Sequence, residues 1–125
     1  MNTTLESLTL ALRRFAAERD WEQFHSPKNL AAALTVEAAE LLEHFQWLTE
    51  EQSRNLPADK RAAVGQEIAD VLLYLLQIAD KLQIDIIAAA NEKLALNAVK
   101  YPVAQAHGSS LKYNELSVQD KVDPS

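Results

Sequence analysis

The hydrophobic positions of this chain recur at intervals of three and four residues, which is the period of a helix buried on one side. In the first such run these positions are Leu5, Leu8, Leu12 and Phe15. A first helix is therefore expected to end near residues 18–20. A second helix is expected from Pro27 to about Leu48, because Ser26 can cap it and proline suits the first helical position.

Caps and prolines mark the remaining elements. Residues 49–52 fit a capping-box pattern, which predicts a short helical turn. After a proline break, a third helix should occupy residues 58–81. Asp85 can cap a fourth helix that runs to about residue 100 and is closed by Pro102. The pattern predicts an all-α fold, a bundle of four main helices.

The third of these helices is apolar over a wider arc than one neighbour can cover. Residues 68–76 read Ile-Ala-Asp-Val-Leu-Leu-Tyr-Leu-Leu. A helix that is hydrophobic nearly all round is buried on more than one side. In a chain this short, a second subunit is the simplest cover, so we expect a homo-oligomer that completes the bundle.

Composition sets the class of protein. The chain has 125 residues, of which 48% are hydrophobic and two are glycine, which favours one helical domain. It has no cysteine, so neither a disulfide nor a zinc-thiolate site is expected. After Pro102 the sequence turns polar. We expect a folded domain over residues 1–106 and a disordered tail over residues 107–125.

Charge and hydropathy bear on partners and location. The net charge is −6, whereas binding to a nucleic-acid backbone requires a basic face, so no nucleic-acid partner is expected. The N-terminus lacks the basic and apolar segments of a targeting signal, and polar residues interrupt each apolar run. A cytoplasmic protein without a membrane partner is therefore expected.

Two acidic pairs, Glu37-x-x-Glu40 and Glu67-x-x-Asp70, lie inside the second and third helical runs. A spacing of three residues places both carboxylates of a pair on one helical face. The first apolar stripe is Leu30, Leu34, Leu41, Phe45 and Leu48, and the second is Val64, Ile68, Val71, Leu75, Ile78 and Leu82. Glu37 falls in the middle of the first stripe, so it should point at a core. If the helices pack antiparallel, the four carboxylates converge.

Carboxylates gathered in apolar surroundings either take up protons or attract a cation. Oxygen ligands suit Mg²⁺ or Mn²⁺, and Mg²⁺ commonly completes its shell with water and substrate phosphates. The pattern therefore indicates a metal site that handles phosphates. Glu43 is a possible fifth acid, and a core or interface position is favoured for His44 over a metal-ligand role.

Three other interpretations of the acids fit the sequence less well. A single Glu-x-x-Glu on a helix usually marks a solvent-facing edge. Two such acidic pairs, together with a row of cationic residues on the fourth helix, indicate a ligand site far more specifically than one pair does. A di-iron bundle needs Glu-x-x-His on two helices, and Glu22-x-x-His25 is the sole instance. A purely structural bundle gives no reason for Glu37 and Glu67 to face a core.

Polar and aromatic residues outside the acidic pairs are the candidates for contacts with a ligand. Lys93, Asn97 and Lys100 form a row on the fourth helix that is either a solvated face or a set of phosphate contacts. Trp21 either staples the first helix to the second or stacks on a ligand. Both alternatives are open at this point.

The order of these motifs resembles the MazG-like all-α nucleoside triphosphate pyrophosphohydrolases. The resemblance rests on the two acidic pairs, followed by Lys93-x-x-x-Asn97-x-x-Lys100-Tyr101-Pro102. Residues 15–25 and Phe45-Gln46-Trp47 are similar to the dCTP pyrophosphatase subgroup. Ala95 stands where the animal dCTP enzymes are expected to carry an acid.

The resemblance implies hydrolysis of a deoxynucleoside triphosphate, dCTP or a modified dCTP, to the monophosphate and pyrophosphate, which cleans the nucleotide pool. Broad specificity and a non-catalytic nucleotide-binding bundle are the alternatives. It further implies that Mg²⁺ or Mn²⁺ is held by Glu37, Glu40, Glu67 and Asp70, and that the chains form a tetramer as a dimer of dimers. The substrate contacts that it implies are Trp21, His25, Trp47, Tyr74, Lys93, Asn97 and Lys100.

Overall fold

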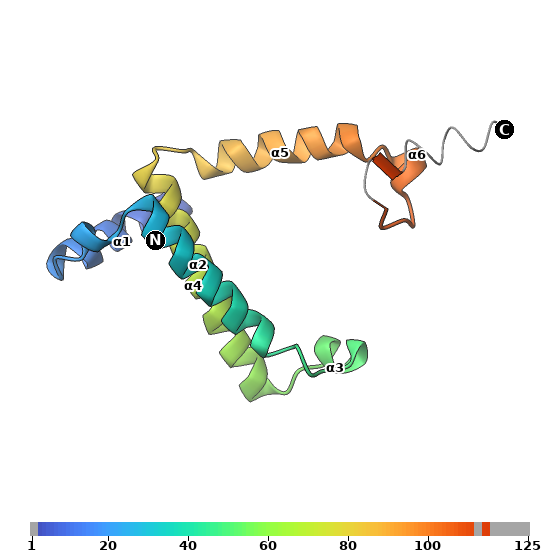
Figure 1. The fold of residues 1–125 in the computed structure, drawn as a ribbon, viewed down its shortest axis with the longest axis horizontal. Coiled ribbons are helices and arrows are strands. Elements are labelled where there is room, and N and C mark those ends of the chain that lie inside the picture. The colour runs from blue at the N-terminus through green and yellow to red at the C-terminus, as the bar shows by residue number, and fades with distance from the viewer. Residues whose placement is uncertain (1–2, 112–113, 116–125) are drawn as a thin grey trace. The chain divides into compact units, whose positions relative to one another are not determined.

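The chain was analysed as a computed structural model, which describes residues 3–111 and 114–115 (Figure 1). Over these residues its regular elements are all helical, which confirms the all-α class. In chain order they are α1 (Leu5–Glu18), the 3₁₀ turn η1 (Glu22–Phe24), α2 (Pro27–Glu43), α3 (Glu50–Arg54), α4 (Ala58–Lys81), α5 (Ile86–Lys100) and α6 (Val103–Ala106). The short α6 was not expected from the sequence.

Side-chain caps fix the starts of the helices where the sequence places them. The Ser26 hydroxyl accepts a hydrogen bond from the Asn29 backbone N–H at 3.1 Å, and Pro27 opens α2. Thr49 begins α3 with a complete capping box. The Asp85 carboxylate accepts a hydrogen bond from the Ala88 N–H at 3.0 Å and starts α5. Local chemistry alone therefore sets these boundaries.

One boundary prediction was wrong: α2 ends at Glu43 and not near Leu48. The backbone N–H groups of His44, Phe45 and Leu48 bond to carbonyls three residues earlier, at 3.3, 2.9 and 2.9 Å. Such bonds form turns tighter than an α-helix. The chain then becomes extended at Thr49 to begin α3. Residues 44–48 are consequently a connector that carries aromatic side chains.

Helices α2 and α4 run antiparallel and side by side, and α1 also packs on α4 (Figure 1). The apolar side chains buried here are Ala16, Leu30, Val64, Leu76 and Ala79. The positions expected in the apolar stripe of α2 are buried or half-buried, as predicted. α4 is thus the central helix of this part of the chain.

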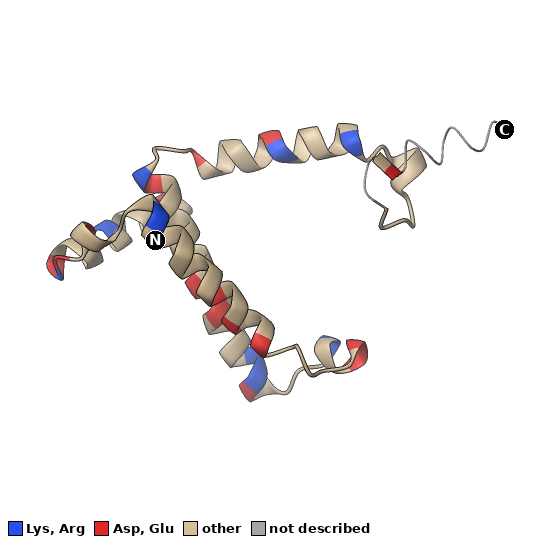
Figure 2. Cartoon of the chain, in the orientation of Figure 1, with Lys and Arg blue, Asp and Glu red and all other residues tan. Residues whose placement is uncertain are grey.

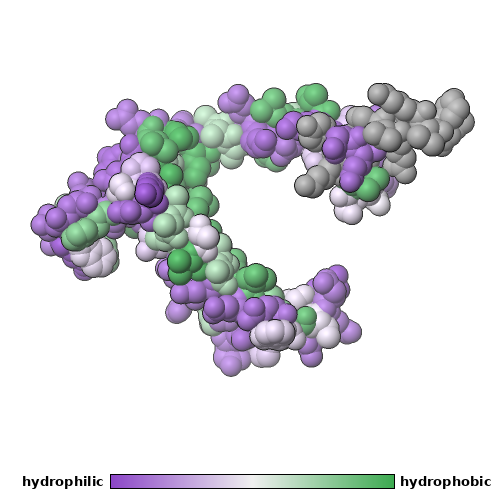
Figure 3. All heavy atoms as spheres, viewed as in Figure 1, coloured by the Kyte–Doolittle hydropathy of each residue, from purple (hydrophilic) through white to green (hydrophobic). Residues whose placement is uncertain are grey.

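The stripe predicted for α4 was partly wrong. Ile68, Leu75 and Leu82 are 53%, 39% and 51% exposed, whereas Leu76 and Ala79 are buried instead. An all-round apolar helix has no single face that its own sequence singles out, so the neighbouring helices decide which side is covered. Hydrophobic side chains accordingly remain visible on the surface (Figure 3).

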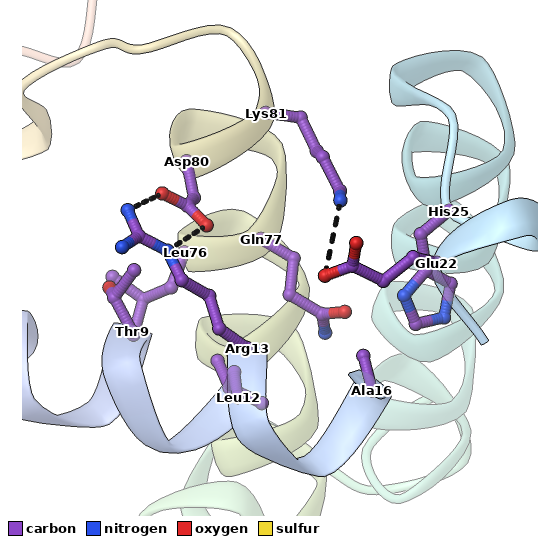
Figure 4. Close-up of a pocket in the computed structure, with 10 residues that line it drawn as sticks. All are labelled: Thr9, Leu12, Arg13, Ala16, Glu22, His25, Leu76, Gln77, Asp80 and Lys81. Atoms are coloured by element: carbon purple, nitrogen blue, oxygen red, sulfur yellow. Dashed lines mark hydrogen bonds and ion pairs between the residues drawn. The ribbon is translucent and has the colours of Figure 1, made fainter. Parts of the chain in front are cut away.

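Charged side chains join α1 and η1 to the end of α4, around a small cavity (Figure 4). Arg13 donates from both Nε and Nη2 to the Asp80 carboxylate, with an Nε–Oδ2 distance of 2.9 Å. This bidentate hydrogen bonding lowers the pKa of Asp80 below its usual range. Lys81 Nζ lies 3.9 Å from Glu22 Oε1. These contacts hold the segment after α1 close to α4.

The chain divides into two compact units, Met1–Ile84 and Asp85–Ser125. Helices α1 to α4 belong to the first unit, and α5 and α6 belong to the second. The expected domain of residues 1–106 stays a prediction. Most of the tail expected to be disordered, residues 112–113 and 116–125, lies outside the described residues.

By length and composition, α4 would also pass as a membrane span, with a mean hydropathy of 1.3 over 18 residues. A core helix passes the same test. The cytoplasmic location and the absence of a membrane partner therefore stay predictions.

Candidate active site

Three carboxylates meet where α2 and α4 lie side by side. Glu37 on α2 and Glu67 and Asp70 on α4 each offer an oxygen atom, and these atoms lie within 4.8 Å of one another. Acidic residues of the two helices gather along this pair (Figure 2). Glu40 follows Glu37 by one turn on the same face of α2 and lies close enough to raise the pKa of the Glu37 carboxyl. The antiparallel packing therefore brings three of the four predicted acids together, with Glu40 next to Glu37 on α2.

The surroundings of this cluster disfavour its negative charges. Burial raises the pKa of Glu37 to about 7, and so do the neighbouring carboxyl of Glu40 and the charges of Asp70 and Glu67. The Oε2 atoms of Glu37 and Glu67 are buried and have no hydrogen-bond partner. Buried oxygens are normally paired, so these two fit ligands of a bound cation. The cluster is thus able to hold a metal ion.

His44 and Glu43 follow the cluster at the end of α2. His44 Nε2 lies 4.0 Å from Glu67 Oε1, and both side chains are 21% exposed. Glu43 is exposed. The half-buried place of His44 agrees with the core or interface position favoured from the sequence, whereas no described contact links Glu43 to the cluster.

An open, largely apolar cavity of about 420 Å³ adjoins the carboxylates. Asp70 belongs to both the cluster and the cavity wall. The lining residues come from α1, from the two residues that flank η1, and from α4: Leu8, Ala11, Leu12, Phe15, Ala16, Trp21, His25, Asp70, Leu73, Tyr74 and Gln77. Binding sites for small organic ligands have this size and this mixture of apolar walls and a few polar groups.

Aromatic rings form one wall of the cavity. Trp21 contacts Phe15 and His25 edge to face, with ring centroids 5.7 and 6.3 Å apart. Asp20 takes a left-handed conformation with φ of 53°, so that the Trp21 N–H reaches the Ala16 carbonyl at 2.9 Å. The end of α1 therefore turns back and presents Trp21 to the cavity, where its side chain is 44% exposed.

Tyr74 lies between the cavity and the acids. Burial raises the pKa of Tyr74 above its ordinary value, and so do the charges of Glu37, Asp70 and Glu40. Its hydroxyl therefore stays protonated at neutral pH and is available as a hydrogen-bond donor. Of the predicted substrate contacts, Trp21, His25 and Tyr74 share this cavity.

The remaining predicted substrate contacts do not line this cavity. Trp47 is in the connector after α2, is 87% exposed and does not line the cavity. Lys93, Asn97 and Lys100 lie on α5, in the second unit. Their contribution to the site therefore stays a prediction.

The sequence analysis missed Phe15 and Gln77 as individual residues of the cavity. Phe15 had been assigned to the apolar stripe of the first helix and to the segment that resembles the dCTP pyrophosphatase subgroup, but not to a ligand contact. Gln77 stands three residues after Tyr74 and seven after Asp70, so all three lie on one side of α4. That spacing was the available signal for Gln77.

The fold and the site together define an all-α protein with an acidic cluster, able to hold a cation, beside an aromatic cavity. The model of the MazG-like family matches residues 32–116, and the chain belongs to this family. It is 44% identical over 115 residues to dCTP pyrophosphatase 1 of Mus musculus and to that of Homo sapiens, covering 90% of this chain and 68% of each relative.

A solved structure gives the same result for the fold. A pyrophosphatase from Archaeoglobus fulgidus is 40% identical and superposes with a TM-score of 0.76, covering 82% of this chain and 95% of that one. The expected MazG-like helical fold and the similarity to dCTP pyrophosphatases are thereby confirmed.

Proposed function

We propose that this protein hydrolyses dCTP or a modified dCTP to the monophosphate and pyrophosphate with the help of Mg²⁺, and so cleans the nucleotide pool. The coarser class, a nucleoside triphosphate pyrophosphohydrolase, follows from its family and its relatives. The observation that carries the proposal is the carboxylate cluster that shares Asp70 with an aromatic cavity. One half of the site suits a cation and phosphates, and the other suits a base.

Glu37, Glu40, Glu67 and Asp70 are proposed to hold Mg²⁺, for which Mn²⁺ is a substitute with similar ligands. The two buried oxygens without partners support this assignment. When bound, such an ion neutralises charge on the phosphates and polarises their oxygens. In the proposed reaction, water adds to the α-phosphorus, the bond from the α-phosphorus to the α,β-bridging oxygen breaks, and pyrophosphate leaves.

The chain's own groups position the substrate for this reaction. Trp21 and Phe15 offer ring surface for a base, and stacking of this kind contributes affinity with little base preference. The protonated Tyr74 can donate to a sugar or phosphate oxygen at the junction of the two halves. We further propose that Lys93, Asn97 and Lys100 contact the phosphates and that Trp47 contacts the base.

The exposed hydrophobic side chains support the proposed homo-oligomer, a tetramer built as a dimer of dimers. Among the described residues, those of α5 and its flank include Leu94, Val99 and Val103, at 67%, 78% and 81% exposed. Exposed apolar surface on this scale marks an interaction site. An exposed Trp47 would be available to a neighbouring subunit. Light scattering coupled to size exclusion would measure the mass, and a monomer at micromolar concentration would refute the oligomer.

The proposed reaction is tested by measuring pyrophosphate release from the four dNTPs, their ribose counterparts and 5-methyl-dCTP, with Mg²⁺ and then with a chelator. We expect metal-dependent release led by the cytosine deoxynucleotides. Equal release from all bases would leave a broad-specificity enzyme. Binding without release would leave the non-catalytic nucleotide-binding bundle.

Matched variants assign the site within that assay. Glu37→Gln and Asp70→Asn should abolish release while the helical circular-dichroism signal is kept. Asp59→Asn, an exposed acid in the first turn of α4, should release pyrophosphate like the unchanged protein. Full activity in Glu37→Gln or Asp70→Asn would show that the site is wrongly assigned.

A further inference from the structure

Aromatic stacking leaves open which groups distinguish one base from another. The polar side chains on the cavity wall are Trp21, His25, Asp70, Tyr74 and Gln77. Asp70 belongs to the carboxylate cluster, and Tyr74 lies beside it. An indole only donates, and a neutral imidazole can present either of its nitrogens as the donor. Gln77 is therefore the one cavity side chain among these that offers a donor and an acceptor in a fixed order.

The position of Gln77 suits the base end of the cavity. Seven residues separate it from Asp70, which corresponds to about 10 Å along one side of α4. A deoxynucleotide spans a comparable length between its phosphate and the edge of its base. The half-buried Gln77 lines both the large cavity and the small cavity next to it, near Ala16 and His25 (Figure 4). Gln77 thus contributes to the walls of both cavities.

A hydrogen bond fixes which way the amide is turned. Gln77 Nε2 donates to the Leu73 carbonyl at 3.2 Å. A carbonyl oxygen only accepts, so the nitrogen and not the oxygen must face it. This leaves Oε1 free to accept and one N–H free to donate. Turning the amide over to exchange these roles would lose the bond to Leu73.

We propose that Gln77 is a specificity-determining residue that reads the amino edge of the base in the proposed site. Cytosine presents a donor at N4 next to an acceptor at N3, which complements the acceptor and donor of the amide. Uracil and thymine present the reverse order, an acceptor at O4 next to a donor at N3. Adenine repeats the cytosine order on a larger ring, so the comparison that isolates Gln77 is between pyrimidines.

This inference rests on the proposed function, and its test separates the two. The rates of pyrophosphate release from dCTP and dUTP are compared with Mg²⁺ present, and those from 5-methyl-dCTP and dTTP likewise. Within each pair the ring size and the 5-substituent are the same. The kcat/KM of the unchanged protein should be about tenfold or more higher for the member of each pair that carries the amino group, dCTP or 5-methyl-dCTP. The reason is that the other member would leave polar groups of the pocket without hydrogen-bond partners.

Gln77→Leu removes both hydrogen bonds and should bring that ratio close to one, mainly through a higher KM for dCTP. Gln77→Glu has nearly the same shape, but its carboxylate cannot donate to N3, so its ratio should also fall. Gln66→Leu, on an exposed position of the same helix, is the matched control and should keep the ratio. The dUTP rate reports separately whether a variant is folded and active.

Release from none of the nucleotides by the unchanged protein would refute the proposed function. If the unchanged protein releases pyrophosphate without preferring the amino member, the class of enzyme stands, but the proposed preference for dCTP and the inference about Gln77 both fail. If the preference for the amino member persists in a Gln77 variant that keeps its helical signal and turnover, only the inference about Gln77 fails.

Discussion

The carboxyl group of Glu37 should make metal binding depend on pH. Its pKa is raised to about 7, first by burial and then by Glu40 and the neighbouring acids. A carboxylate ligand must be deprotonated, so a proton and a metal ion compete for this position. Lowering the pH from 8 to 6 is therefore a direct perturbation of the site.

The size of the effect follows from the pKa of Glu37. With a pKa of about 7, Glu37 is roughly nine-tenths ionised at pH 8 and roughly one-tenth ionised at pH 6. The apparent affinity for a divalent cation should accordingly fall about tenfold for each pH unit well below 7 and level off above about 8. At pH 6, binding should release close to one proton from this group.

Calorimetric titration of the metal-free protein with Mn²⁺ at pH 6, 7 and 8 measures this effect. Repeating each titration in buffers of different ionisation enthalpy counts the protons released. Glu37→Gln should bind more weakly but with little change in affinity between pH 6 and 8. Glu43→Gln, an exposed acid on the same helix, should keep the pH dependence. Equal affinity at pH 6 and 8 with no proton released would refute the reasoning.

The same group affects the stability of the metal-free protein. Because the pKa of Glu37 is higher in the folded state than its ordinary value of 4.5, folding takes up a proton between pH 4.5 and about 7. The stabilisation is complete below pH 4.5 and is lost as the pH rises through 7. The unfolding temperature of the metal-free protein should therefore fall as the pH is raised from 4.5 to 7. It should fall less in Glu37→Gln.

Three further predictions concern single residues. Trp21→Ala should raise KM about tenfold through lost stacking, with a smaller change in kcat. Phe24→Ala, whose ring is outside the cavity, should not raise KM. Equal KM values for Trp21→Ala and the unchanged protein in steady-state assays would contradict the stacking role. Leu76→Ala should lower the free energy of unfolding by about 3 kcal/mol in urea titrations, because Leu76 is only 2% exposed, and a loss below about 1 kcal/mol would place it outside the core. Gln83 has a left-handed φ of 54°, a conformation that favours glycine. Gln83→Gly should therefore raise the free energy of unfolding by ~0.5 kcal/mol, net of the extra entropy of glycine in the unfolded chain. No gain in this free energy would show that the conformation is unstrained.

Features fixed by neighbouring residues could be predicted from the sequence. Ser26 and Asp85 begin their helices with their own side chains, whatever lies further away in the chain. The three-residue spacing of each acidic pair likewise places both acids on one helical face. The all-α class and the meeting of the acids followed from these local rules, together with the antiparallel return that short connections favour.

Features that depend on packing could not be predicted. The periodicity of α4 does not choose among its apolar faces, so it did not show that Leu76 is buried while Leu75 is exposed. The end of α2 at Glu43 reflects a change from α-helical bonds to tighter turns, for which residues 44–48 carry no proline or glycine signal.

The sequence by itself determined the main helices, their caps and the shared helical face of each acidic pair, because each depends on residues three or four positions apart. Only the tertiary structure decided that Asp70 joins the acids to an aromatic cavity and that Gln77 stands on its wall with its amide held by Leu73. The cavity exists because α1 and the turn after it pack on α4, more than fifty residues later in the chain. Contacts over such separations depend on the shapes of both partners, which no local spacing encodes.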